Sequence, residues 1–143
     1  MLKAYSYSKK DFVSKMQKEN ITDTTVEDTN DYYICIDSTG GPNSDPYFEQ
    51  FHPNVLNLHF DDVSEDKENW GEDIKAYYKA VAPTLTQITH IKRFVDSAVG
   101  TVHIHCVKGE SRSKAVADYV NNTRIAHDSK YAYELIRNTL DEL

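Results

Sequence analysis

The chain has 143 residues, the size of one domain with a single core, so we treat residues 1–143 as one unit. It carries 16 Lys and Arg against 23 Asp and Glu, and this net charge of −7 argues against nucleic acid or an anionic membrane as a partner. No apolar leader or membrane span is visible, so we expect a soluble, cytoplasmic protein and a monomer. Its two cysteines, Cys35 and Cys106, are too few for a disulfide framework.

The first part of the chain alternates short apolar runs with one helical pattern. Residues 2–7 predict a strand, and residues 8–20 predict a helix that begins with a capping serine. An apolar, β-rich run over residues 32–36 predicts a buried strand, and residues 55–60 predict a second one. Between these strands, residues 47–51 predict a short helical turn.

Helical spacing dominates the second part of the chain. Apolar residues at helical intervals predict a helix over residues 74–81, which Pro83 interrupts, and another over residues 85–98. Residues 101–105 form the next clear strand pattern. Two further helices are expected over residues 113–120 and 129–140.

Strands that alternate with helices predict an α/β fold, in which helices flank a central, mostly parallel β-sheet. In such folds chemistry usually occurs at a turn beyond the carboxyl end of a strand. The turn that follows His105 holds the largest group of chemically useful side chains, so we expect the functional site there.

This turn leads from Cys106 at the end of a strand to Arg112 at the start of a helix. A short loop in this position directs backbone N–H groups inward, and the helix dipole adds partial positive charge, so an oxyanion is favoured at its centre. The same field favours the reactive thiolate form of a cysteine. The residues expected to contact a phosphate are Val107, Lys108, Gly109, Glu110, Ser111 and Arg112.

The properties of three residues strengthen this interpretation. The forked guanidinium of Arg112 can bind two phosphoryl oxygens at once. Gly109 permits the backbone to approach an anion closely, with a positive φ. Ser113 can direct its hydroxyl back to the sulfur and stabilise it as a leaving group.

These residues resemble the cysteine-dependent phosphatases of the protein-tyrosine-phosphatase superfamily, and more closely the dual-specificity branch. The resemblance is sharp over Val102 to Ser113 and loose over Ile34 to Leu140. It implies a protein-tyrosine-phosphatase-like fold and a hydrolase of phosphotyrosine, with phosphoserine and phosphothreonine as a second substrate class. It implies no cofactor, because the loop supplies the positive field. The motif consists of His105, Cys106, Gly109, Ser111, Arg112 and Ser113.

The resemblance also implies a loop aspartate that protonates the leaving oxygen. Asp61 and Asp62 both follow the expected strand over residues 55–60. In the dual-specificity branch one residue separates the end of this strand from the acid, so Asp62 is the preferred general acid and Asp61 the alternative. Glu65 and Asp66, in an acidic stretch after these residues, are further possibilities. The Trp-Pro-Asp loop and the later glutamine of the large tyrosine-specific enzymes are both absent, so the small branch fits better.

Other features allow two interpretations each. His105 is expected to order the loop by hydrogen bonding, and no metal site is expected, because His103 and His105 share a strand face from which Cys106 points away. Cys35 is either an inert core thiol or a partner for a protective disulfide with Cys106. The aromatic residues Trp70, Tyr77 and Tyr78 either pack in the interior or form a substrate wall.

Two other functions stay open at this point. A catalytically weak domain with the same loop would bind phosphorylated partners, and an RNA 5′-phosphatase would use the same loop, although the charge of −7 argues against it. Lys108 is opposed by Glu110, which argues against highly anionic lipid head groups. The expected partner is a phosphorylated protein, presented as a short, neutral-to-basic segment.

Overall fold

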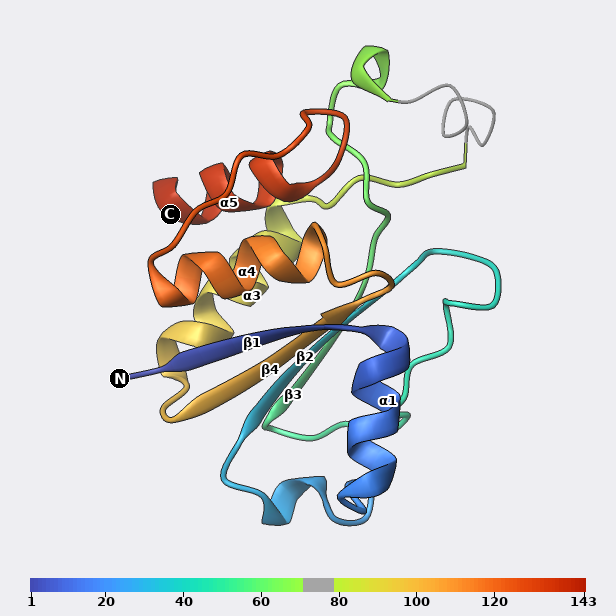
Figure 1. The fold of residues 1–143 in the computed structure, drawn as a ribbon, viewed down its shortest axis with the longest axis vertical. Helices are drawn as coiled ribbons and strands as arrows, with labels where there is room; N and C mark the ends of the chain where they lie inside the picture. Colours follow the sequence, from blue (N-terminus) through green and yellow to red (C-terminus); the bar gives the residue numbers. More distant parts are fainter. Residues whose placement is uncertain (71–78) are drawn as a thin grey trace.

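The computed structural model describes residues 1–70 and 79–143. Within them, four strands form one sheet in the order β1-β4-β2-β3, and every neighbouring pair is parallel (Figure 1). The α/β architecture predicted from the alternating pattern is therefore confirmed. The strands are β1 (Lys3–Ser8), β2 (Tyr32–Asp37), β3 (Val55–His59) and β4 (Thr101–Cys106). The helices are α1 (Lys9–Lys18), α3 (Leu85–Ser97), α4 (Arg112–Asn121) and α5 (Tyr133–Glu142), with short 3-10 turns at Val26–Asp28 and Lys67–Asn69.

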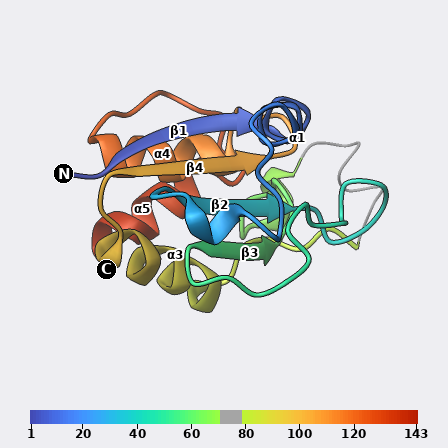
Figure 2. The same ribbon diagram turned by 90° about the horizontal axis from the view of Figure 1, so that it is seen from below.

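The helices cover both faces of the sheet (Figures 1 and 2). Successive residues of a strand point to opposite faces, so each strand contributes to two separate cores. On one face, Ile34 and Ile104 pack with the residues of α3, α4 and α5. On the other face, Tyr33 and Cys35 pack with Phe12 of α1. Burial on both faces explains why most of the β2 sequence is an apolar run, whereas β4 turns the buried imidazoles of His103 and His105 to one face.

Local signals start α1 and α3 where the sequence predicts. Ser8 caps α1 by accepting a hydrogen bond from the Asp11 N–H at 3.1 Å. At the start of α3, Thr84 and Gln87 form a reciprocal capping box. Because α1 follows β1 without a loop, its first residues lie at the carboxyl end of the sheet.

Three expected helical segments need comment. Residues 47–51 form no helix; Phe48 is fully buried among aromatic rings, and its carbonyl accepts a hydrogen bond from the Asn57 side chain at 2.8 Å. The last helix begins at Tyr133 and not at residue 129, because the Ala132 N–H bonds to Asp62. Of the helix expected over residues 74–81, residues 74–78 lie outside the described residues, and residues 79–81 are not helical.

An ion cluster fastens the loop before β3 to the turn after α1. His52, with a side chain only 3% exposed, donates from both ring nitrogens, to Glu27 at 2.5 Å and to Asp23 at 2.7 Å. These hydrogen bonds, first to Glu27 and then to Asp23, raise the pKa of His52 above its ordinary value of 6.5. The two carboxylates therefore favour the imidazolium form of His52.

The parallel arrangement brings the loops after β2, β3 and β4 to one edge of the sheet. Both chain termini lie at the opposite end of the molecule (Figures 1 and 2). In the part of the chain that the structure describes, no helix is both long enough and apolar enough to cross a membrane.

Candidate active site

A cavity of about 650 Å³ opens at the carboxyl edge of the sheet. Its floor is the loop between β4 and α4, and its walls come from several other segments. These wall residues lie in 38–43, 61–63, 79–80 and the connection between α4 and α5. The site predicted from the turn after His105 therefore lies in a real concavity, and segments distant in the sequence complete it.

Cys106 lies at the bottom of this cavity and is only 2% exposed. Its Sγ accepts a hydrogen bond from the Gly109 N–H at 3.2 Å and lies 3.1 Å from the Ser113 Oγ. Both contacts favour negative charge on sulfur when their hydrogens point to it. The roles predicted for Gly109 and Ser113 are thus geometrically available.

Three carbonyl groups of the loop are held from outside by other parts of the chain. A carbonyl oxygen only accepts, so each partner must be the donor. The Lys9 N–H donates to the Val107 oxygen at 3.0 Å, the Ser6 hydroxyl to the Gly109 oxygen at 3.2 Å, and His127 Nε2 to the Glu110 oxygen at 3.1 Å.

These outward carbonyls orient the amide groups that follow them. In a trans peptide, C=O and N–H point in opposite directions, so the N–H groups of Lys108, Glu110 and Ser111 face the centre of the loop. None of these amides donates to another group among the described residues. The loop therefore presents backbone donors toward its centre, an arrangement suited to an oxyanion, and we call it the cradle.

Two hydroxyl groups connect the sulfur to the first strand. Ser113 Oγ lies 2.7 Å from Ser6 Oγ, and Ser6 donates to the Gly109 carbonyl. Each hydroxyl has one proton, so the chain from Cys106 S–H through Ser113 and Ser6 to that carbonyl satisfies every donor when the thiol is protonated. With a thiolate, the Ser113 proton turns to sulfur instead. Ser6 is thus a site residue that the motif does not contain.

Arg112 is the first residue of α4 and is only 5% exposed. Its Nη1 donates to the Phe60 carbonyl at 2.8 Å, which fixes the guanidinium between the cradle and the loop after β3. No carboxylate of the described residues forms an ion pair with it, and its buried Nε donates to none of their atoms. A buried cation without a balancing charge favours an anion at the edge formed by Nε and Nη2.

His105 lies beneath the cradle, against the ring of Phe12 at a centroid distance of 4.5 Å. Burial lowers the pKa of His105 to about 4, so the ring is neutral and its Nδ1–H donates to the Cys106 carbonyl at 3.2 Å. His103 shares this face and bonds to Tyr7 and Asp31. Within residues 1–70 and 79–143, no group of His, Cys, Asp or Glu is arranged to hold a metal ion.

The two candidate acids occupy different environments. Both oxygens of Asp61 are engaged, by Thr39 N–H at 3.2 Å and its hydroxyl at 2.6 Å, and by Val81 N–H at 2.8 Å. Among the described residues, Asp62 accepts one hydrogen bond, from the Ala132 N–H at 3.0 Å, through Oδ1. Both side chains line the cavity. Asp61 therefore braces two loops, whereas no described residue forms a hydrogen bond to Asp62 Oδ2.

The further acidic and aromatic candidates lie elsewhere. Glu65 and Asp66 are exposed and are not part of the cavity wall. Trp70 is 6% exposed and donates from its indole nitrogen to the Ser64 carbonyl at 2.8 Å, so it is a packing residue. Tyr77 and Tyr78 lie outside the described residues.

Cys35 is separated from Cys106 by the sheet. It is paired in register with His105, one position before Cys106, so the two thiols point to opposite faces. Burial raises the pKa of the Cys35 thiol well above its ordinary value. The protective disulfide is therefore not compatible with this fold, and the interpretation as a core thiol holds.

Several wall residues have no local sequence signal. Thr39 follows the end of β2 and could have been found, since neighbouring parallel strands end at the same edge. His127 and Tyr131, in contrast, lie in a helix-to-helix connection whose course depends on tertiary contacts. Ser6 belongs to an ordinary alternating strand.

Comparisons of the chain with family models, with curated proteins and with solved structures gave no match. The chemical evidence is therefore the site itself: a cysteine, a cradle of inward amides, a buried arginine and a carboxylate around one cavity.

Proposed function

We propose that the protein is a phosphoric monoester hydrolase that removes the phosphate from phosphotyrosine in proteins through a cysteinyl-phosphate intermediate. The observation that carries this proposal is the position of Cys106 Sγ inside a loop whose amides face inward, beside the buried Arg112, which pairs with no carboxylate of the described residues. Such a loop binds the equatorial oxygens of a phosphoryl group and holds phosphorus above the sulfur.

In the first step, the Cys106 thiolate attacks phosphorus. The S–P bond forms as the P–O bond to the leaving group breaks, and Asp62 gives its proton to the departing oxygen. The free edge of Arg112 and the loop amides stabilise the charge on the three equatorial oxygens. The bond from Arg112 to the Phe60 carbonyl keeps the cradle in a fixed relation to the loop that carries Asp62.

In the second step, water attacks phosphorus opposite sulfur. The Asp62 carboxylate takes a proton from the water as the new P–O bond forms and the S–P bond breaks. Inorganic phosphate leaves, and the Ser113 hydroxyl donates to the emerging thiolate at the observed 3.1 Å. No redox cofactor enters the electron balance of either step.

The cavity supports an aromatic ester as substrate. Val63, Ala80 and Tyr131 provide apolar wall surface next to the cradle, and the volume of about 650 Å³ accepts a phenyl phosphate. Lys108 and Glu110 on the loop offset each other in charge. These features agree with a phosphoprotein segment more than with a highly anionic head group.

Hydrolysis of p-nitrophenyl phosphate in the presence of a chelator tests the proposal. We expect turnover by the intact chain, none by Cys106→Ser, and unchanged kcat/KM for the matched control Cys35→Ala. Turnover that survives Cys106→Ser would overturn the mechanism. Binding of a phosphotyrosine peptide without turnover by the intact chain would replace the hydrolase with a phosphate-binding module.

The identity of the acid has its own test. We expect Asp62→Asn to lower kcat by about 10² to 10⁴-fold, with a larger effect on phenyl phosphate than on p-nitrophenyl phosphate, because the poorer leaving group needs the proton more. Asp61→Asn should lower thermal stability and change kcat less, since its oxygens hold Thr39 and Val81. The reverse pattern would make Asp61 the acid.

A further inference from the structure

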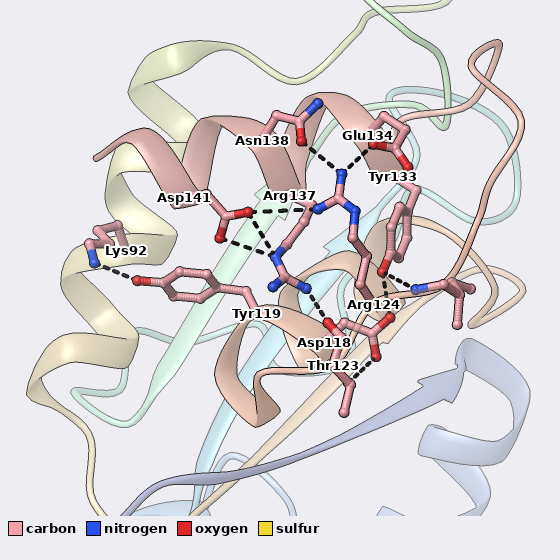
Figure 3. A network of polar contacts seen from close by, with 11 residues as sticks. Lys92, Asp118, Tyr119, Thr123, Arg124, Tyr133, Glu134, Arg137, Asn138 and Asp141 are labelled. Atoms are coloured by element: carbon pink, nitrogen blue, oxygen red, sulfur yellow. Dashed lines mark hydrogen bonds and ion pairs between the residues drawn. The ribbon is translucent and has the colours of Figure 1, made fainter.

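The connection between α4 and α5, residues 122–132, is fastened at its first end by a polar network (Figure 3). Asp118 of α4 is buried and accepts from the Tyr133 hydroxyl at 2.5 Å and the Thr123 hydroxyl at 2.9 Å. Arg137 donates to the Thr123 carbonyl, and Arg124 donates to Glu134 at 2.5 Å. We call residues 122–132 the crossing segment.

The other end of the crossing segment is fastened to the loop that carries the proposed acid. The Ser64 N–H donates to the Lys130 carbonyl at 3.1 Å, and the Ala132 N–H donates to Asp62 at 3.0 Å. Figure 1 shows the segment running back alongside α5 toward the carboxyl edge of the sheet. A segment held at both ends can keep a side chain in a fixed place between them.

His127 is the side chain held in this way. Its ring stacks on Tyr133 at a centroid distance of 5.2 Å and an interplanar angle of 12°. It also packs edge-to-face with the Tyr131 ring, with the two centroids 5.6 Å apart. Its Nε2 donates to the Glu110 carbonyl at 3.1 Å, whereas its buried Nδ1 has no hydrogen-bond partner among the described residues.

The two nitrogens of His127 have opposite effects on stability. A phenyl ring would fit the same aromatic contacts without leaving a buried nitrogen unpaired. What histidine adds is one donor to one cradle carbonyl. A residue that stabilises little and bonds to the site is expected to serve the site and not the fold.

We propose that His127 is a positioning residue, which holds the Glu110 carbonyl outward so that the Ser111 N–H faces the bound phosphoryl group. The expected change in kcat/KM rests on the proposed function, whereas the expected orientation of the Ser111 amide requires only that the loop binds phosphate. Without the bond, the peptide between Glu110 and Ser111 can rotate and withdraw one donor from the equatorial oxygens.

The test compares His127→Phe with His127→Gln, which restores a donor on a side chain of similar reach. We expect His127→Phe to lower kcat/KM for p-nitrophenyl phosphate by about tenfold, less than the 10² to 10³-fold typical of a donor that is lost completely. Its melting temperature should stay equal or rise. His127→Gln should recover most of the activity, and His90→Phe, on the exposed side of α3, should behave as the intact chain.

A second measurement is independent of turnover. In an amide NMR titration with inorganic phosphate, the Ser111 resonance of the intact chain should shift, and His127→Phe should reduce this shift more than the shift of Lys108. Equal kcat/KM and equal Ser111 shifts in the intact chain and His127→Phe would overturn the proposal. An equal reduction of the phosphate-induced shift at every amide of the cradle would overturn it too. A His127-dependent shift in a chain without turnover would uphold the positioning role and contradict the hydrolase.

Discussion

Replacing Gly109 with alanine tests whether the cradle depends on close packing against the first strand. Gly109 has a φ of +75°, and a Cβ there would lie 2.6 Å from the Ser8 nitrogen and from the Tyr7 carbonyl carbon. These are backbone atoms of a strand that pairs with β4 along its whole length, so they cannot move aside. The loop must move instead.

The size of the movement follows from these distances. Ordinary contact begins at 3.4 Å, so the loop has to shift by about 0.8 Å. A misplacement of about 1 Å can reduce a reaction rate by about 10²-fold, because the reacting atoms leave their alignment. Backbone strain at a positive φ adds about 1 to 3 kcal/mol of destabilisation.

We therefore expect Gly109→Ala to remain folded by circular dichroism, to melt at a lower temperature, and to lose about 10²-fold in kcat/KM for p-nitrophenyl phosphate. Gly100→Ala is the matched control, because Gly100 has a φ of +90° and no atom within 4 Å of the added Cβ. It should lose stability from strain alone and keep its kcat/KM. If Gly109→Ala kept the activity of Gly100→Ala, the packing of the cradle on β1 would not matter to the reaction.

Three other measurements follow from the structure. Arg112→Lys should lower kcat/KM by about 10²-fold or more, because an ammonium cannot bind two oxygens with one planar edge; activity within about threefold of the intact chain would contradict this. Ser113→Ala should slow breakdown of the cysteinyl-phosphate and produce a rapid burst of nitrophenolate in stopped-flow assays, and Ser6→Ala should do so more weakly; single-phase traces from both would contradict it. The free energy of unfolding in urea should be highest near pH 6.5. It rises between about pH 4 and 6.5, because the unfolded chain binds a proton that buried His105 rejects, and it falls above 6.5, because folded His52 retains a proton that the unfolded chain loses. His52→Gln should remove the decline above pH 6.5.

Regular elements could be predicted because their signals are local. The β2 segment contains its own apolar run, and the capping serine of α1 lies next to the helix that it starts. The loop between Cys106 and Arg112 could be predicted for the same reason, because the strand, the short loop and the helix that form it are consecutive in the chain.

The errors occurred where tertiary contacts outweigh local preference. Phe48 lies in a segment with helical spacing, yet burying its ring among other aromatic side chains holds the backbone in an irregular loop. The first residues of the expected last helix bond to the loop after β3 and not to each other, so α5 begins at Tyr133. Neither outcome has a signal within the segment concerned.

The candidate site shows the same division between local and distant determinants. The residues inside the cradle are consecutive in the chain, but the donors that turn its carbonyls outward come from Ser6, Lys9 and His127. A loop with the same motif but without these three supports would not have its amides fixed toward one point. A loop motif in a sequence therefore predicts which residues meet the anion, whereas the orientation of those amides depends on the rest of the fold.

The net charge of −7 and the cradle act on a ligand over different distances. Charges on the exposed surface are screened over about 8 Å at physiological ionic strength, whereas the loop amides and Arg112 would contact the phosphoryl oxygens directly. A polyanion extends over many screening lengths and meets the whole acidic surface, so its binding is opposed. A single phosphoryl group at the base of the cavity would instead contact oriented N–H groups and one buried cation directly. An acidic protein can therefore select one phosphate on a protein segment and reject a chain of phosphates.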